Sequence, residues 1–480
     1  QRNVILRVAR MVPPMYLSSW VTSADGTEIY LFDEEGRHLE TRDARTHALV
    51  HAFGYDGDGL LSTVSDAHNR TTTIQRSQGT VTGVMGPDGV TTAITVDANG
   101  YLDTITDASA AVIDLDHGPT GLLEAMSDSN SLTEFEYDTG GALLEDRHTV
   151  VYSPPSGGTE AEVITKDVVP LATAGPESAS VQHISPELRE TTYWFERNGT
   201  NVEREVTFPD QTQNTSSHTP ERDQVTFADG TIITTEWEAD ERLGANTRAP
   251  SEIRVQTPDN LLRETTFVRS FEPRCSIYDE EAECVPPLPP EGAQDRRLRA
   301  DRIVETVQSG TQTWTSTYDR AHLEAGSPVP AQIVAVAPTG RSTTTTLNDA
   351  GQVASVQVGT LAPVVYGYDL QGRVTSISQS DGVQTRAVTF GYATNGWLET
   401  MTDAQNRTTT FQRDAVGRIL QQISPEPSEV VGFTYDDDGN VTSVTPPSRP
   451  AHDFHYDSAN RLREYAPPAV TGVPDPETRY

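Results

Sequence analysis

The chain has 480 residues, of which 35% are hydrophobic and 7% aromatic, and 35 Lys and Arg against 70 Asp and Glu give a formal net charge of −35 at pH 7. A field of that sign repels phosphate groups, which argues against nucleic acid and anionic membrane surfaces as partners. We therefore predict a soluble, self-repelling surface, with cation binding or a high-salt environment as alternatives.

The sequence also lacks the marks of a membrane-inserted segment. No apolar run reaches the roughly 18 residues that a transmembrane helix needs, so we predict no membrane insertion. The chain begins at Gln1 without a basic-then-apolar leader, and we expect it to be a fragment of a longer protein.

Residues 1–150 repeat one short unit. It consists of an aromatic or β-branched residue, Asp, two further residues and Gly, followed by an apolar position. The spacing is regular, since Gly59, Gly79, Gly100 and Gly121 follow one another at intervals of 20, 21 and 21 residues. The repeat positions in this part of the chain are Tyr55, Asp56, Gly59, Asp97, Gly100, Tyr137 and Asp138.

The Asp-x-x-Gly unit predicts a turn. The Asp side chain caps the backbone two residues on, and Gly adopts the positive φ that other residues avoid. Between the turns, runs such as 60–64 and 89–96 alternate with period two and are rich in Val, Ile and Thr, which predicts strands. Because such units cannot bury a face alone, we expect them to stack into one continuous antiparallel sheet, which makes the fold all-β.

The repeat is broken in residues 151–340. Pro, Gly and Ser are frequent over 149–179, and strand-like segments resume in stretches that include 191–195 and 262–271. We interpret this part as irregular β-units of the same sheet with loop insertions, and residues 286–302 as weakly helical. Cys275 and Cys284 favour a local disulfide over a zinc site, with two unpaired thiols as the alternative.

The repeat resumes in residues 341–480. Asp403 to Arg413 also repeats nearly all of Asp66 to Arg76, including the run Asn-Arg-Thr-Thr-Thr. Asn460 stands where the other copies have Gly, as expected for a turn position, because Asn tolerates positive φ next best. The repeat positions here are Tyr368, Asp369, Gly372, Asp414, Gly417, Tyr435, Asp436, Gly439, Tyr456 and Asp457.

Two interpretations are open for the side chains of this unit. The tyrosines are predicted to form a stacked ladder that holds the strand register, with sugar binding as the alternative. The Asp-rich turns are predicted to be capped turns, with calcium binding as the alternative because their oxygens are closely spaced. The calcium candidates are Asp436, Asp438, Asn440, Asp56 and Asp58.

No catalytic signature is present. The sequence has no Gly-x-Ser-x-Gly, no His-Glu-x-x-His and no phosphate-binding loop, so we predict no catalytic residues and no cofactor. His452 and His455 flank Asp453, and alternation on a strand explains them better than a metal or acid–base role.

The repeats of the form Tyr-Asp-x-x-Gly-Arg-[Leu/Val], and stretches such as DAQNRTTTF, resemble the RHS (YD) repeats of large bacterial proteins. The segments 225–264 and 442–468 are also similar to that family. The resemblance implies a long β-sheet that spirals into a hollow shell, as in toxin-complex shells, polymorphic toxins and teneurins. In the toxins the shell encloses a C-terminal effector, and in teneurins it is part of an extracellular adhesion scaffold.

One departure from the family matters. The self-cleaving toxin shells end in an Asp-Pro-x-Gly element, and the nearest match here, residues 473–477, lacks the Gly. We therefore transfer no autoprotease to this chain. The resemblance implies a secreted or cell-surface, non-enzymatic shell whose partner is its own C-terminal or enclosed polypeptide.

Two other functions stay open. One is an adhesion or self-assembling scaffold, which would bind cell-surface glycans on Trp194, Trp237, Trp314 or Trp397, or other copies of the chain. The other is an envelope enzyme, which the missing motifs disfavour.

Overall fold

The structure is a computed structural model that describes residues 19–129, 131–152, 160–171, 178–185, 188–240, 242–272, 302–324, 327–426, 429–468 and 478–479. Within these ranges the chain forms strands and turns and no helix, which confirms the predicted all-β class. Cys275, Cys284 and residues 286–301 lie outside the described residues, so neither the disulfide nor the weak helix is tested.

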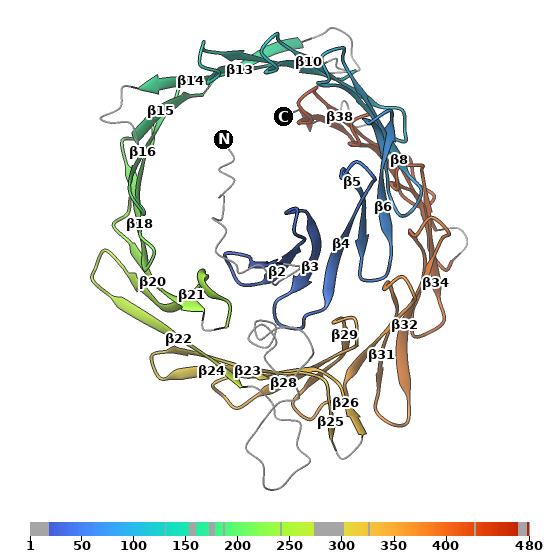
Figure 1. The fold of residues 1–480 in the computed structure, drawn as a ribbon. Coiled ribbons are helices and arrows are strands. Elements are labelled where there is room, and N and C mark those ends of the chain that lie inside the picture. Colours follow the sequence, from blue (N-terminus) through green and yellow to red (C-terminus); the bar gives the residue numbers. More distant parts are fainter. Residues whose placement is uncertain are drawn as a thin grey trace.

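Within the described ranges the strands follow one another at short intervals (Figure 1). The early strands are β1 (Ser19–Thr22), β2 (Glu28–Phe32), β3 (His38–Asp43), β4 (Leu49–Tyr55), β5 (Leu61–Asp66), β6 (Thr71–Ser77), β7 (Thr80–Met85), β8 (Thr91–Val96), β9 (Leu102–Thr106), β10 (Val112–His117), β11 (Leu123–Ser127), β12 (Leu132–Tyr137) and β13 (Leu143–Tyr152).

The strands of the middle part are longer on average. They are β14 (Glu160–Leu171), β15 (Ser178–Ile184), β16 (Glu190–Asn198), β17 (Asn201–Thr207), β18 (Gln213–His218), β19 (Arg222–Thr226), β20 (Ile232–Asp240), β21 (Gly244–Gln256), β22 (Leu262–Glu272), β23 (Arg302–Ser309), β24 (Gln312–Asp319), β25 (His322–Glu324), β26 (Ser327–Val329) and β27 (Gln332–Val336).

Short strands return in the last part. They are β28 (Ser342–Leu347), β29 (Val353–Val358), β30 (Val364–Tyr368), β31 (Val374–Ser380), β32 (Thr385–Tyr392), β33 (Leu398–Thr402), β34 (Thr408–Arg413), β35 (Ile419–Ile423), β36 (Val430–Tyr435), β37 (Val441–Thr445), β38 (His452–Tyr456), β39 (Leu462–Ala466) and β40 (Thr478–Arg479).

One 38-stranded sheet contains all of these strands except β25 and β26, which pair with each other. Each strand of the large sheet is antiparallel to the one before and the one after it, and β24 pairs directly with β27. The irregular middle part belongs to the same sheet, because β13 pairs with β14 and the ladder continues through β23. The predicted repeat-built antiparallel sheet is therefore confirmed.

The repeated turn explains the short strands. Asp56 N donates to Leu60 O and Gly59 N donates to Asp56 O, with Gly59 at φ 79°. This is a type I turn closed by a bulge at a left-handed residue, a tight connection between antiparallel strands. The same turn forms at the other edge of the sheet, where Asn69 takes the left-handed position at φ 59°. The segment that recurs at 66–76 and 403–413 thus begins with a turn, which the sequence analysis did not assign.

The sheet winds through more than one turn of a spiral, so hairpin tips of early strands meet hairpin tips of late strands. Ala48 lies against Gly351, His68 lies against Gly372, and Val151 is hydrogen-bonded to Ser458, 307 residues away. We call the chain up to Val151 the first coil, the chain from Asp240 onward the second coil, and the line where their tips meet the seam.

The spiral narrows toward its beginning. The contact between Ala44 and Arg242 spans 198 residues, whereas that between Val151 and Ser458 spans 307. Figure 1 shows the consequence, since β2 and β3 lie inside the ring that the later strands form.

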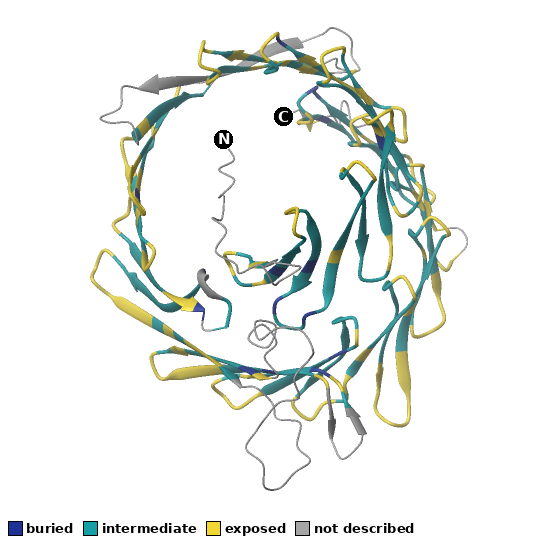
Figure 2. Ribbon diagram, viewed as in Figure 1, coloured by how far each residue is buried: buried dark blue, intermediate teal, exposed yellow. Residues whose placement is uncertain are grey.

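The wall is one sheet thick. The accessible surface is 30940 Å² for a chain of 52.3 kDa, whereas a compact monomer of that mass exposes about 17,500 Å². Among the residues whose burial is described, the buried ones occur in short patches (Figure 2). The buried apolar cluster, formed by Ile303, Tyr318, Ala331 and Leu347, is correspondingly small.

Candidate functional site

The carboxylate of the repeated turn is committed to its own backbone. Asp369 Oδ1 accepts hydrogen bonds from Gln371 N at 3.0 Å and Arg373 N at 2.9 Å, and Gly372 adopts φ 73°. The two bonds satisfy amides that the tight turn leaves without strand partners. Asp97, Asp138, Asp414 and Asp457 cap their turns in the same way, and Gly100, Gly417 and Gly439 likewise take positive φ.

The Arg that follows the turn connects it to the next hairpin. Arg373 Nε donates to Asp369 Oδ2 at 2.8 Å, and its guanidinium lies 4.4 Å from the centre of the Tyr392 ring. Arg418 repeats this arrangement with Asp414 and Tyr435, and its Nη1 also donates to Asp436 O at 3.1 Å. A planar guanidinium suits this position because it can bond a carboxylate and cover a ring at once.

The tyrosine hydroxyl completes the connection. Tyr392, at the end of β32, donates to the carbonyl of Val374, the first residue of β31, at 2.8 Å. Tyr55, Tyr137, Tyr368 and Tyr435 make the same bond to the first residue of the preceding strand. Each bond fixes the register of a strand against its neighbour.

The prediction of a stacked tyrosine ladder is therefore wrong in its geometry. No pair among the repeat tyrosines of the described residues has its rings in contact. Tyr435 and Tyr456 end β36 and β38, two strands apart, which is about 9.5 Å in a sheet, whereas rings in contact lie about 4.5–7 Å apart. Where an Arg follows the turn glycine, its guanidinium lies over the next tyrosine ring instead, as Arg373 does over Tyr392.

The glycine before the tyrosine serves close packing. Gly391 faces Thr400 across β32 and β33, and a Cβ on Gly391 would lie 2.3 Å from Thr400 Oγ1. Gly54 and Gly367 are in the same relation to Thr63 and Ser376. The hydroxyl thus fills the space that a side chain would need.

The turn carboxylates Asp369 and Asp414 have lowered pKa values. Burial of Asp369 raises its pKa, but the amide and the guanidinium of Arg373 outweigh this and hold the pKa below the usual value of 3.8. For Asp414 burial is again opposed by Arg418, and the pKa is lowered. These carboxylates are therefore ionised wherever the wall is folded near neutral pH.

The calcium candidates lie on separate hairpins. Asp56 Oδ1 accepts Asp58 N and Leu60 N, while Asp436 accepts both the amide and the side chain of Asn440. Among the residues described, no three His, Cys, Asp or Glu side chains are grouped to hold a metal ion. Calcium binding stays a prediction.

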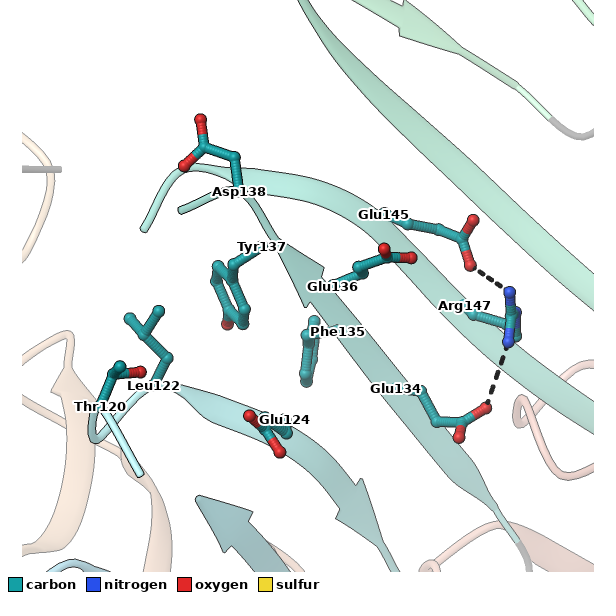
Figure 3. A pocket seen from close by; sticks show the side chains of 10 residues that line it. All are labelled: Thr120, Leu122, Glu124, Glu134, Phe135, Glu136, Tyr137, Asp138, Glu145 and Arg147. Carbon is teal, nitrogen blue, oxygen red and sulfur yellow. Dashed lines mark ion pairs between the residues drawn. The ribbon is translucent and has the colours of Figure 1, made fainter. Parts of the chain in front are cut away.

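A pocket of about 430 Å³ opens over β11 to β13 (Figure 3). Glu136 lies opposite Glu145 in the strand register, and Arg147 bonds Glu145 at 2.6 Å and approaches Glu134 at 3.8 Å. One guanidinium thus faces three carboxylates. The pocket suits a basic group, and periodicity alone did not reveal it because its residues come from three strands.

The aromatic and histidine candidates have internal contacts. Trp237 Nε1 donates to Asp223 Oδ2 at 2.9 Å, and Trp397 packs over Gly417. Trp314 is 36% exposed, and Trp194 lines a small polar pocket. His452 bonds the Tyr465 hydroxyl at 2.7 Å, and it lies three residues from His455 on β38, so alternation separates the two.

Comparison with known proteins agrees with this architecture. The model of the family described as Teneurin YD-shell matches residues 18–473. The chain belongs to the teneurin YD-shell family. Human Teneurin-4 is 34% identical over 119 residues, which is 24% of this chain, and Drosophila melanogaster Teneurin-m is 25% identical over 457 residues, which is 93% of it. This YD-shell chain spans 4% and 16% of those two proteins.

Solved structures share the fold. The crystal structure of TcdB2-TccC3 without its hypervariable C-terminal region has a TM-score of 0.53 at 13% identity, over 91% of this chain and 23% of that one. The Photorhabdus luminescens Tc holotoxin pore has a TM-score of 0.51 at 12% identity, over 91% and 23% of the two chains. The described residues contain no helix long and apolar enough to cross a membrane.

Proposed function

We propose that this chain is a non-enzymatic wall segment of a secreted or cell-surface β-shell, which in the full-length parent encloses or presents a polypeptide. The observation that carries the proposal is the spiral of a single-layer sheet. Its winding is supported by contacts such as Val151 to Ser458, and its surface is far larger than that of a compact protein. A one-layer wall leaves both faces of the sheet accessible to solvent or to a partner. This arrangement suits a container better than an enzyme.

The charge of the wall supports a polypeptide as the partner. Acidic pockets such as the one at Glu136 and Glu145 attract basic side chains, and the net charge of −35 disfavours nucleic acid. The enclosed partner would be the parent's own C-terminal or neighbouring polypeptide. No cofactor or catalytic residue enters the proposal.

Limited proteolysis of the full-length parent tests the proposal. Polypeptide inside an intact wall should resist a protease that cuts it rapidly once the wall is unfolded by acid or urea. Equal cutting rates before and after unfolding would show that the wall encloses nothing. A cryo-EM map of the same sample should show density inside the spiral.

A second candidate is adhesion through glycans. It has one specific observation in its favour, the exposure of Trp314, with Trp194 beside polar groups. A glycan array compares the chain with W314A and W194A. Binding that both variants retain would exclude these tryptophans as platforms.

A further inference from the structure

Two kinds of contact hold the wall together, and they differ in density. Along the sheet, neighbouring strands form ladders, the longer of which include the seven registered pairs between β16 and β17 from Thr192↔Thr207 to Asn198↔Asn201. Across the seam, turns of one coil meet turns or strand residues of the other at separate points, such as Arg45 with Glu305 in β23. The seam therefore runs through the wall without a ladder of its own.

The end of the seam nearer the C-terminus is held by Ser458. Its amide donates to Val151 O at 2.9 Å, its Oγ accepts from Val151 N at 2.7 Å, and its Oγ also approaches Thr149 O at 3.4 Å. Ser458 is 8% exposed and its neighbour Asp457 is 3% exposed, although both belong to a hairpin tip. The edge of β13 covers them.

The end of the seam nearer the N-terminus is held by a second group of contacts. Arg45 pairs with Glu305 at 3.2 Å, Arg242 donates to Ala44 O, and Thr247 Oγ1 donates to Ser23 O at 3.1 Å. Ala44 and Thr247 are each 1% exposed. Both ends of the seam are thus closed by contacts that include buried residues.

The seam between these ends contains a cavity of about 530 Å³. Residues of both coils line it, and five of them are aspartates. The lining carboxylates are those of Asp107, Asp114 and Asp128 from the first coil and Asp437 and Asp438 from the second. A cavity removes packing contacts, and carboxylates that face one another across it repel.

Arginines also lie near these carboxylates. Burial raises the pKa of Asp107, but hydrogen bonds from Ser109 and Ala111, with the charge of Arg418, lower it. Arg461 and Arg463 lie 2.8 Å and 3.6 Å from Asp457. His455 lies at the adjoining cavity with Asp436 and Asp438. Because five carboxylates from the two coils line one cavity, we expect repulsion to contribute across this part of the seam at neutral pH.

We propose that the wall opens along the seam while the ladders between neighbouring strands stay intact, and that the Ser458 contact with Val151 is the latch that opposes opening. Low ionic strength favours the open form, because the facing carboxylates are then less screened. The inference concerns the wall alone and holds whatever the wall encloses.

Native-state hydrogen exchange on the 480-residue chain tests the proposal. The amides of Ser458 and Val151 should exchange through one local opening, well before those of β16 and β17, which require loss of their ladder. Raising the salt concentration from about 0.01 M to about 1 M should slow exchange at both seam amides. Exchange of the seam and ladder amides at one common rate, or seam exchange that salt does not slow, would overturn the proposal.

The variant S458A removes the acceptor of the Val151 amide. Exchange at Val151 should accelerate about tenfold, the change expected for one hydrogen bond, with β16 and β17 unchanged. The matched control is S380A, because Ser380 bonds Gln384 and Gly382 within its own hairpin. If S380A accelerated Val151 exchange as much as S458A, the latch assignment would be wrong.

Discussion

At the scale of the residue, the turn aspartate has two separate hydrogen-bonding roles. Its Oδ1 caps two amides of the turn, and its Oδ2 holds the Arg that reaches the next hairpin, as Asp369 and Arg373 show. No other side chain combines two acceptor atoms with a reach this short. Asn keeps the first function and loses the charge that the second requires.

Replacing Asp369 by Ala removes both functions. The free energy of unfolding should fall by about 1–3 kcal/mol, the range for a lost cap and a hydrogen bond to a charged group. Urea unfolding followed by circular dichroism measures it. The control is Q371A, because Gln371 is exposed in the same turn. A loss as large in the control would mean that the carboxylate is not the cause.

The lowered pKa values predict how stability depends on pH. Asp66, Asp369 and Asp414 have pKa values below those of the unfolded chain, because Arg side chains and turn amides outweigh the effect of burial. Their stabilisation is fully present above the unfolded pKa of about 3.9 and is lost as the pH falls through the folded pKa. Melting temperatures should therefore drop steeply below about pH 4. A double variant D369A/D414A should show a shallower drop, and an equal drop would contradict the assignment.

At the scale of the element, a hairpin is fixed by what faces it across the strand pair. Gly391 is the clearest case, because the Thr400 hydroxyl lies where its side chain would be. The variant G391A should cost about 1–3 kcal/mol through overpacking. Adding T400A should recover much of this loss, and denaturation of the two single variants and the double variant measures the coupling. G432A is the control, since the nearest atom there is 3.7 Å from the added Cβ. Additive losses would exclude the steric explanation.

The sequence predicted these hairpins well and the contacts between them poorly. Asp-x-x-Gly marked the turns of the regular repeat, and period-two alternation located strands between them, because both signals are local. Turns with another residue at the left-handed position, such as Asn69 and Ala110, were not marked. The role of Arg373 beside Tyr392 was missed because it joins different hairpins, and the pairing of Val151 with Ser458 was missed because 307 residues separate the two. Contacts between hairpin tips do not require apolar residues at a regular spacing, so no pattern in the sequence predicts them.

At the scale of the whole molecule, net charge opposes the fold. Excess carboxylates repel across tens of ångströms, whereas pairs such as Arg373 with Asp369 are in contact at 2.8 Å. Salt screens the long interactions first, since the screening length is about 8 Å at physiological ionic strength and about 3 Å at 1 M. The melting temperature should therefore rise with sodium chloride. A fall would show that the local ion pairs outweigh the repulsion.

Metal removal gives a further check on the whole chain. Asp56 and Asp436 already accept the amides of their own turns, so a chelator should leave the melting temperature unchanged in calcium-free and calcium-containing buffer. Differential scanning calorimetry with and without the chelator measures it. A shift would establish the calcium interpretation of the turns.

The meander also constrains how such a wall can change in length. A single added strand would send every later turn to the opposite edge, so the tips that now meet the first coil, such as those of Gly372 and Ser458, would point away from it. An added pair of strands, about one repeat, returns the chain to the same edge and shifts each seam partner by one hairpin. Length variants of this wall should therefore differ by whole hairpins. Whether such a variant keeps its stability should depend on whether each hairpin tip can replace its neighbour as a seam partner.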